Sequence, residues 1–195
     1  MCSGKCSRCI AATLYPLVLL SIICNIVLFF PGLDVKYVRG GHITDEVKYM
    51  GGIIGGGVMV LIPAFYIHLT GEQGCCGNRI GMFLSIVFAV VGLAGALYSF
   101  TVAMLGLANG PFCKEGDKWT APFKNSNSTY MSDAKSWEKC TEPKNVVQFN
   151  LGLFMTLAAT SCLQGLLLAT QVINGLVGCV CGTSNNKEGA IGSMA

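Results

Sequence analysis

The sequence predicts an all-α membrane protein, in which four transmembrane helices form a bundle with a small second extracellular loop closed by a disulfide. Three observations predict this fold. Hydrophobic residues make up 52% of the chain, charged residues only 12%, and the mean hydropathy is +0.58, whereas about 25% of an average soluble domain is charged. Four apolar runs are long enough to cross a hydrocarbon core of about 30 Å as helices. A polar segment that contains a pair of cysteines separates the last two runs.

The first span is expected at residues 10–30, after a short head at residues 1–9. The run carries no charge and is longer than the apolar core of a typical signal peptide. It ends in Phe29-Phe30-Pro31, which is not a small-residue cleavage site. We therefore expect an uncleaved membrane anchor.

The second span, at residues 49–69, follows a short polar loop at residues 31–48 and is rich in glycine. Its glycines are Gly51, Gly52, Gly55, Gly56 and Gly57. In water each would cost a helix about 1 kcal/mol relative to alanine. In lipid, glycines four residues apart instead remove side chains from one face and let another helix approach closely. The pairs Gly51/Gly55 and Gly52/Gly56 have this spacing, so we expect this helix to be the packing centre.

The third and fourth spans are expected at residues 80–107 and 149–180. A turn at residues 70–79 precedes the third span, and the polar segment 108–148 separates the two. The tail at residues 181–195 is polar and is expected to be disordered. Because the chain crosses four times, both termini are expected on one side of the membrane.

Three amides in the fourth span form a polar stripe. Gln164 and Gln171 are seven residues apart and fall on nearly one helix face, with Asn174 close by. Amides inside a membrane commonly hydrogen-bond between helices, although the same stripe is able to line a polar path. Helix packing is the favoured interpretation, and a channel or carrier is the alternative.

The cysteines predict the orientation. Nine Lys and Arg residues lie on the side of the loops at residues 31–48 and 108–148, and four lie on the side of the termini. This count by itself would place the termini outside the cell. Most of the nine, however, lie in the longer loop among acidic residues. Thiols beside helix ends are typical of reversible acylation in the cytosol, whereas in an oxidising compartment they would be expected to pair. The side of the membrane that holds the termini is therefore predicted to be cytosolic. Seven cysteines lie on this side: Cys2, Cys6, Cys9, Cys75, Cys76, Cys179 and Cys181.

The long loop carries two features of an extracellular segment. Cys113 and Cys140 bracket it, and a bridge between them would stabilise the fold by roughly 3–4 kcal/mol in the chain-entropy model. Asn127 begins the acceptor pattern Asn127-Ser128-Thr129 for N-glycosylation. Both features agree with cytosolic termini.

Several other classes of function are not expected. The chain has two histidines, His42 in a loop and His68 at a membrane edge, and no acidic residue inside a predicted span, so catalytic and ion-coupling groups are not evident. Cys6-x-x-Cys9 with Cys75-Cys76 offers four thiols for zinc, but the spacing is poor. The net charge is +3 and the basic residues are not massed in one stretch, which argues against a nucleic-acid partner. We expect no enzyme, no metal and no cofactor, only acyl chains and one N-glycan.

Motifs along nearly the whole chain form a recognisable set. They are Met1-Cys2-x-Gly4-Lys5-Cys6-x-Arg8-Cys9, Met50-Gly51-Gly52-x-x-Gly55-x-Gly57, Cys75-Cys76-Gly77, Asn109-Gly110-Pro111-x-Cys113, Trp137-x-x-Cys140-x-Glu142-Pro143 and Gln171-Val172-Ile173-Asn174-Gly175. This set resembles the transmembrane 4 L-six family, the tumour-antigen relatives of the tetraspanins. The chain departs from the family at Gly152, which removes an acceptor site often found there. Tetraspanins proper carry Cys-Cys-Gly in the large loop rather than in the short turn.

The residues and the resemblance together predict a non-enzymatic membrane organiser. The bundle would associate laterally with other membrane proteins and with lipid, and acylation would tune this association. The resemblance implies tetraspanins, integrins and growth receptors as partners, with effects on proliferation, adhesion and migration. It also implies a multi-pass protein of the plasma membrane, with endosomal membranes and a homo-oligomer left open. The alternative is a small channel or solute-sensing carrier that uses the amides of the fourth span.

Overall fold

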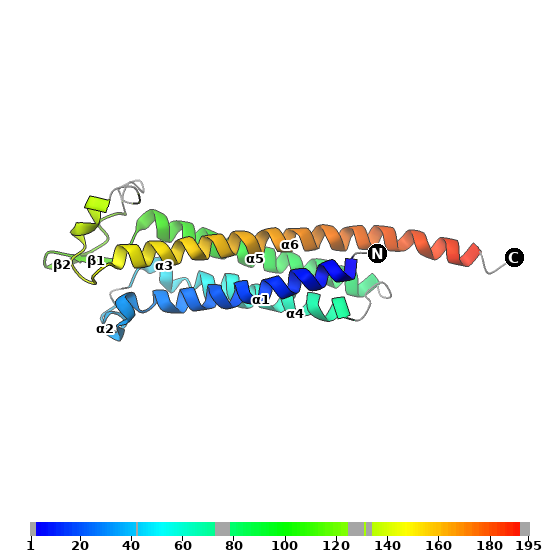
Figure 1. Cartoon of the computed structure of the whole chain (residues 1–195), viewed down its shortest axis with the longest axis horizontal. Coiled ribbons are helices and arrows are strands. Elements are labelled where there is room, and N and C mark those ends of the chain that lie inside the picture. The colour runs from blue at the N-terminus through cyan, green and yellow to red at the C-terminus, as the bar shows by residue number, and fades with distance from the viewer. Residues whose placement is uncertain (1–2, 42, 73–78, 125–130, 132–133, 192–195) are drawn as a thin grey trace.

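The computed structural model describes residues 3–41, 43–72, 79–124, 131 and 134–191. Four long helical segments run side by side along one axis (Figure 1). They are α1 (Ser3–Leu28), the π-helix η2 (Gly51–Val58) continued by α4 (Met59–Glu72), α5 (Arg79–Asn109) and α6 (Val146–Ile191). Each contains a stretch long and apolar enough to cross a membrane. The predicted four-helix membrane fold is thus confirmed.

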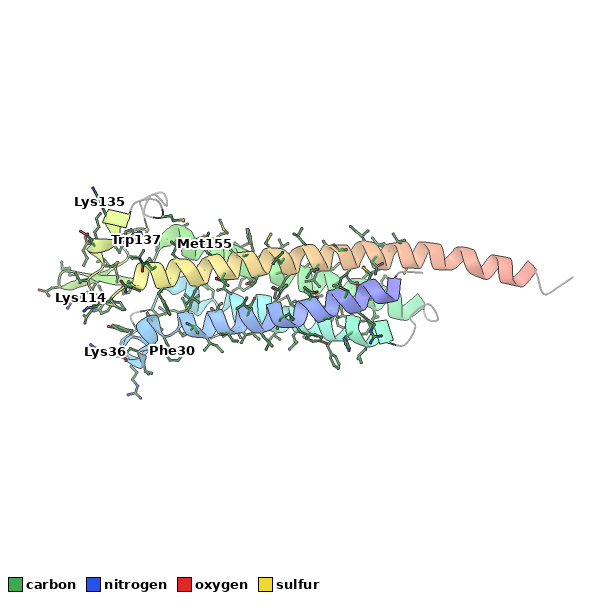
Figure 2. The ribbon with its side chains drawn as sticks, viewed as in Figure 1. Phe30, Lys36, Lys114, Lys135, Trp137 and Met155 are labelled. Carbon is green, nitrogen blue, oxygen red and sulfur yellow. A yellow bond between two sulfur atoms is a disulfide. The ribbon has the colours of Figure 1, made fainter. Side chains whose placement is uncertain are left out.

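The two ends of the bundle differ. Both described chain ends lie toward one end, which we call the termini end, and the segments that connect α1 to η2 and α5 to α6 lie at the other, the loop end (Figure 1). Figure 2 shows Lys36, Lys114 and Lys135 at the loop end. A two-stranded antiparallel sheet there adds a small β element to the predicted all-α fold. The loop end comprises η1 (Pro31–Leu33), α2 (Val35–Arg39), α3 (Asp45–Lys48), β1 (Cys113–Glu115), β2 (Lys118–Thr120) and η4 (Ala134–Lys139).

Two helices are longer than the sequence predicts. α1 already begins at Ser3, within the expected head, and Ser7 is buried against the rest of the bundle. α6 continues to Ile191, beyond the ends of the other helices (Figure 1), where the sequence predicts a disordered tail. No proline follows Pro143 in the chain, so no residue lacking a backbone N–H interrupts the helical hydrogen bonds.

The buried face of α6 follows a seven-residue repeat. The spacing alternates between three and four residues through four successive repeats. This is the pattern of helices that pack with a left-handed twist in coiled coils and in most membrane bundles. α6 packs against α1, α5 and η2 along this face. The buried positions are Val147, Asn150, Phe154, Leu157, Ser161, Gln164, Leu168, Gln171 and Gly175.

The outer surface of the bundle is apolar. Large side chains such as Phe65, Phe83 and Met155 are more than half exposed, and Met155 is marked on α6 in Figure 2. Four threonines also face outward, and each donates its hydroxyl to the carbonyl four residues earlier, which satisfies that donor without water. The pairs are Thr13 with Cys9, Thr101 with Leu97, Thr156 with Gly152, and Thr170 with Leu166.

Candidate functional site in the bundle core

The backbones of η2 and α5 touch at two glycines. A Cβ atom added to Gly55 would lie 2.5 Å from the carbonyl oxygen of Gly95. One added to Gly95 would lie 2.8 Å from the carbonyl oxygen of Gly55 and 2.5 Å from Cβ of Met59, the first residue of α4. Van der Waals repulsion does not tolerate non-bonded carbon–oxygen or carbon–carbon contacts this short. Only residues without a side chain therefore allow these two helices to lie this close.

The other glycines of η2 face further helices. The Cβ position of Gly51 lies 2.8 Å from Cβ of Val102 on α5. That of Gly52 lies 2.7 Å from Cβ of Asn25 on α1 and 2.8 Å from Cδ2 of Leu157 on α6. The glycine-rich segment thus contacts the three other long helices of the bundle.

Two side-chain amides hold the backbone of η2. Asn25 Oδ1 accepts a hydrogen bond from the backbone N–H of Ile53 at 3.2 Å, and Gln164 Nε2 donates to the carbonyl oxygen of Gly56 at 2.8 Å. Asn25 is 2% exposed and Gln164 is 0% exposed. Backbone that departs from α-helical hydrogen bonding is tolerated at membrane depth where protein buries it and supplies partners. The sequence marks Asn25 as a polar residue in an apolar span but does not indicate its partner.

Hydroxyl groups surround Gln164. Ser21 Oγ on α1 donates to Thr160 Oγ1 on α6 at 3.2 Å, and Ser161 Oγ on α6 donates to Ser99 Oγ on α5 at 2.8 Å. These four side chains are no more than 5% exposed. Together with Gln164 they form a buried polar cluster, which we call the core cluster.

A second polar cluster lies nearer the termini end. Gln171 Oε1 accepts from Ser7 Oγ on α1, and Gln171 Nε2 donates to Ser85 Oγ on α5, both at 3.2 Å. Asn174 Nδ2 donates to Ser7 Oγ, also at 3.2 Å. The three amides of the predicted stripe therefore bond between helices or to the η2 backbone. Leu168, which lies between the two glutamines on the buried face of α6, is 0% exposed.

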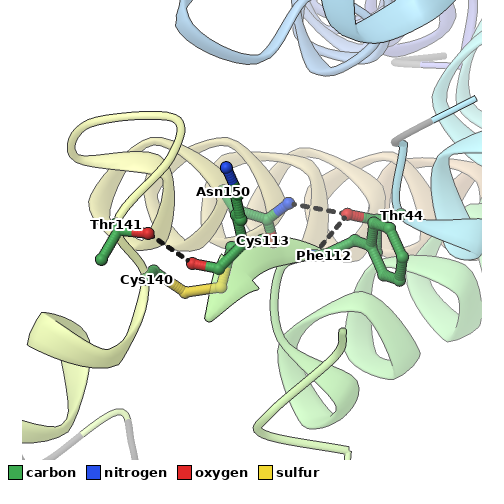
Figure 3. Close-up of a disulfide and its surroundings, with 7 residues drawn as sticks. Thr44, Phe112, Cys113, Cys140, Thr141 and Asn150 are labelled. Carbon is green, nitrogen blue, oxygen red and sulfur yellow. Dashed lines mark hydrogen bonds between the residues drawn. A yellow bond between two sulfur atoms is a disulfide. The ribbon is translucent and has the colours of Figure 1, made fainter. Parts of the chain in front are cut away.

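A third polar cluster fastens the loop end. Asn150 Nδ2 on α6 and the backbone N–H of Phe112 both donate to Thr44 Oγ1, at 3.5 and 3.4 Å (Figure 3). Asn109 Nδ2, at the end of α5, donates to the carboxylate of Glu46, which is 8% exposed. These bonds tie the segment before η2 to the ends of α5 and α6. Sequence reasoning missed Thr44 and Glu46 because they lie in a loop with other polar residues.

The predicted bridge between Cys113 and Cys140 is confirmed. The two Cα atoms are 5.4 Å apart, and the bond joins β1 to the end of η4 (Figure 3). Next to it, the backbone N–H of Thr141 and its hydroxyl both donate to the carbonyl oxygen of Lys114, at 3.0 and 2.8 Å. Cys113 is fully buried in a small apolar cluster with Phe123 and Val146. The disulfide thus anchors the loop on the end of α6.

The cysteines predicted to be acylated lie in part within the described residues. Cys6 and Cys9 are exposed near the start of α1, and Cys179 is half-buried on α6. Cys181 lies on α6, and no further detail of its side chain is described. Cys2, Cys75, Cys76 and the glycosylation candidate Asn127 lie outside the described residues. Within the ranges that the structure describes, no group of three or more His, Cys, Asp or Glu side chains is able to hold a metal ion.

The chain is similar to known proteins over almost its whole length. A family model described as L6 membrane protein matches residues 1–185. Transmembrane 4 L6 family member 1 of Homo sapiens is 41% identical, with 93% of this chain and 95% of that protein covered. Member 4 of Rattus norvegicus is 44% identical, covering 93% of each chain, and member 5 of Homo sapiens is 36% identical, covering 96% of this chain and 98% of that protein. No solved structure matches significantly.

Proposed function

Because the chain belongs to the L6 membrane protein family, and is thus a multi-pass membrane protein, we propose that it is a non-enzymatic membrane organiser. It associates laterally with other membrane proteins, of which the tetraspanins, integrins and growth receptors implied by its family resemblance are the first candidates. Through them it influences proliferation, adhesion and migration. It acts at the plasma membrane, with both termini in the cytosol.

The observation that carries this proposal is the closed core of the bundle. Gln164 and Gln171 bond to neighbouring helices, and the buried Leu168 lies between them within an apolar cluster that includes Leu14 and Val18. This arrangement supports helix packing rather than a continuous polar path. Asp, Glu, Lys and Arg are absent from the central parts of the four spans. These parts are residues 9–28, 49–69, 83–109 and 146–177. Ion-coupled transport commonly relies on such charged residues.

Acylation of the termini end supports lateral association. The exposed Cys6 and Cys9 lie three residues apart near the start of α1, where α1 packs against α6 through Ser7. Acyl chains on these thiols would enter the adjacent leaflet and hold the helix end at the membrane surface, since each buried CH₂ contributes about 0.8 kcal/mol. Lipid attached there changes which neighbours the bundle meets without altering its core.

Replacement of the seven proposed acylation sites by serine is expected to remove specific partners. Wild type and this variant are crosslinked in cells and isolated in mild detergent, and the proteins isolated with them are identified by mass spectrometry. We expect a discrete set of membrane proteins with wild type and its loss with the variant. Cys162→Ser is the matched control, because Cys162 is exposed but lies inside the membrane-spanning part of α6.

The result of this comparison decides between the two functions. Both proteins must first reach the same membrane in equal amounts. The absence of a specific partner in both would contradict the organiser and favour the channel or carrier. Flux measurements on Gln164→Leu and Gln171→Leu would then test that alternative directly.

The proposed orientation predicts a glycan on Asn127. Treatment of the protein from cells with peptide N-glycosidase is expected to increase its mobility on a gel by the mass of one glycan. Asn127→Gln should migrate like the treated wild type and should not respond to the enzyme. An unchanged wild-type band would contradict a luminal or extracellular loop that carries this glycan.

A further inference from the structure

The side-chain carbonyl of Gln164 has no hydrogen-bond donor among the described residues. Its Nε2 donates to Gly56, whereas its Oε1 is buried and unpaired, and the whole residue is 0% exposed. An unsatisfied buried acceptor is costly to the folded state because it has lost its hydrogen bonds to water. This cost would arise at the contact between α6 and η2, in the interior of a membrane bundle.

A second observation concerns the oxygen atoms around Gly56. The Cβ position of Gly56 lies 3.1 Å from Ser21 Oγ, 3.1 Å from Ser99 Oγ and 3.2 Å from Gln164 Oε1. Three oxygen atoms from α1, α5 and α6 therefore surround the side of Gly56 on which other residues carry a side chain. Such a convergence is distinct from the apolar contacts made by Gly51, which meets only the side chain of Val102.

The hydroxyls leave hydrogen-bonding capacity for a further partner. Ser161 and Ser99 share one hydrogen bond between their hydroxyls at 2.8 Å. Whichever of the two donates, the other retains a proton for another acceptor. A molecule that both donates and accepts would satisfy the carbonyl of Gln164 and this hydroxyl pair together.

We propose that one water molecule binds beside Gly56, where it donates to Gln164 Oε1 and bonds to the hydroxyls of Ser21 and Ser99. Three hydrogen bonds is the usual number for a buried structural water. The site offers only neutral oxygens, so a cation would remain without a counter-charge at membrane depth. The water links η2 to α1, α5 and α6. This inference does not depend on the proposed function.

The test is a water contact experiment by NMR on the wild-type protein in deuterated detergent micelles. Magnetisation transfer from water is expected to the side-chain amide protons of Gln164. The side-chain amide of Gln171 is the matched control, because its Nε2 donates to a serine hydroxyl and its Oε1 also has a protein donor. Proton exchange with solvent water through a serine hydroxyl would produce magnetisation transfer to the side-chain amides of both Gln164 and Gln171. A water molecule bound beside Gly56 produces this transfer at Gln164 alone.

Three further results bear on the proposal. Gly56→Ala places a methyl group at the site and is expected to abolish transfer to Gln164, and Ser99→Ala is expected to reduce it. Equal transfer to Gln164 and Gln171, or none to Gln164 in the folded wild type, would overturn the water site. Replacement of sodium by potassium or choline should leave the Gln164 resonances unchanged. A saturable sodium-dependent shift would identify a cation in place of the water.

Discussion

Replacement of Gly55 by alanine is expected to destabilise the bundle by about 1–3 kcal/mol or more, the range for overpacked cores. The added Cβ would lie 2.5 Å from the carbonyl oxygen of Gly95 and 3.0 Å from the backbone nitrogen of Ser99. Both atoms belong to the backbone of α5, so no side-chain rotation relieves the contact. The helices must separate, which weakens the adjoining packing of η2. The measurement is the thermal or denaturant midpoint of the purified protein in micelles.

Gly152→Ala is the matched control for this prediction. Gly152 also lies in a helix, is exposed on α6, and has no atom within 4 Å of its Cβ position. Alanine there should leave the midpoint unchanged or raise it slightly, because alanine favours helix over glycine. Equal midpoints for the two variants would contradict a close approach of η2 and α5 at Gly55.

Loss of the bridge between Cys113 and Cys140 is expected to destabilise the loop end by roughly 3–4 kcal/mol in the chain-entropy model. The bond closes a loop with a sequence separation of 27 residues, and its removal increases the conformational freedom of the unfolded segment. The double variant Cys113→Ser/Cys140→Ser also introduces a hydroxyl at Cys113, which is fully buried. Hydrogen exchange is expected to accelerate in β1 and β2.

The core of the bundle should respond much less to this change. The contacts of Gly55 with Gly95 and of Gln164 with Gly56 do not involve the loop end, so the amides of η2 and α5 are expected to retain their protection. Reduction of the wild type should reproduce the effect, and Cys162→Ser should have none. Unchanged exchange in β1 and β2 after complete reduction would show that the surrounding contacts suffice to hold the hairpin.

The sequence predicts the four spans and the bridge because both depend on local properties of the chain. An apolar run of sufficient length must cross the membrane as a helix, since no water is available to the backbone. The two cysteines that bracket the long loop lie in one polar segment, away from the other thiols. The same reasoning failed for the tail, because polar composition does not by itself end a helix and no proline interrupts α6 before Ile191.

Sequence alone thus determined that this is a four-span membrane protein with a glycine-rich second helix, an amide stripe and a bridged loop. Only the tertiary structure decided that η2 is a π-helix, that Asn25 bonds to Ile53, and that Gln164 meets Gly56. It likewise paired Ser7 with Gln171, 164 residues later in the chain. The physical reason is that a helix face is set by local periodicity, whereas its partner depends on how separate helices cross. In a membrane, that crossing is decided by close packing and by the pairing of each buried polar group.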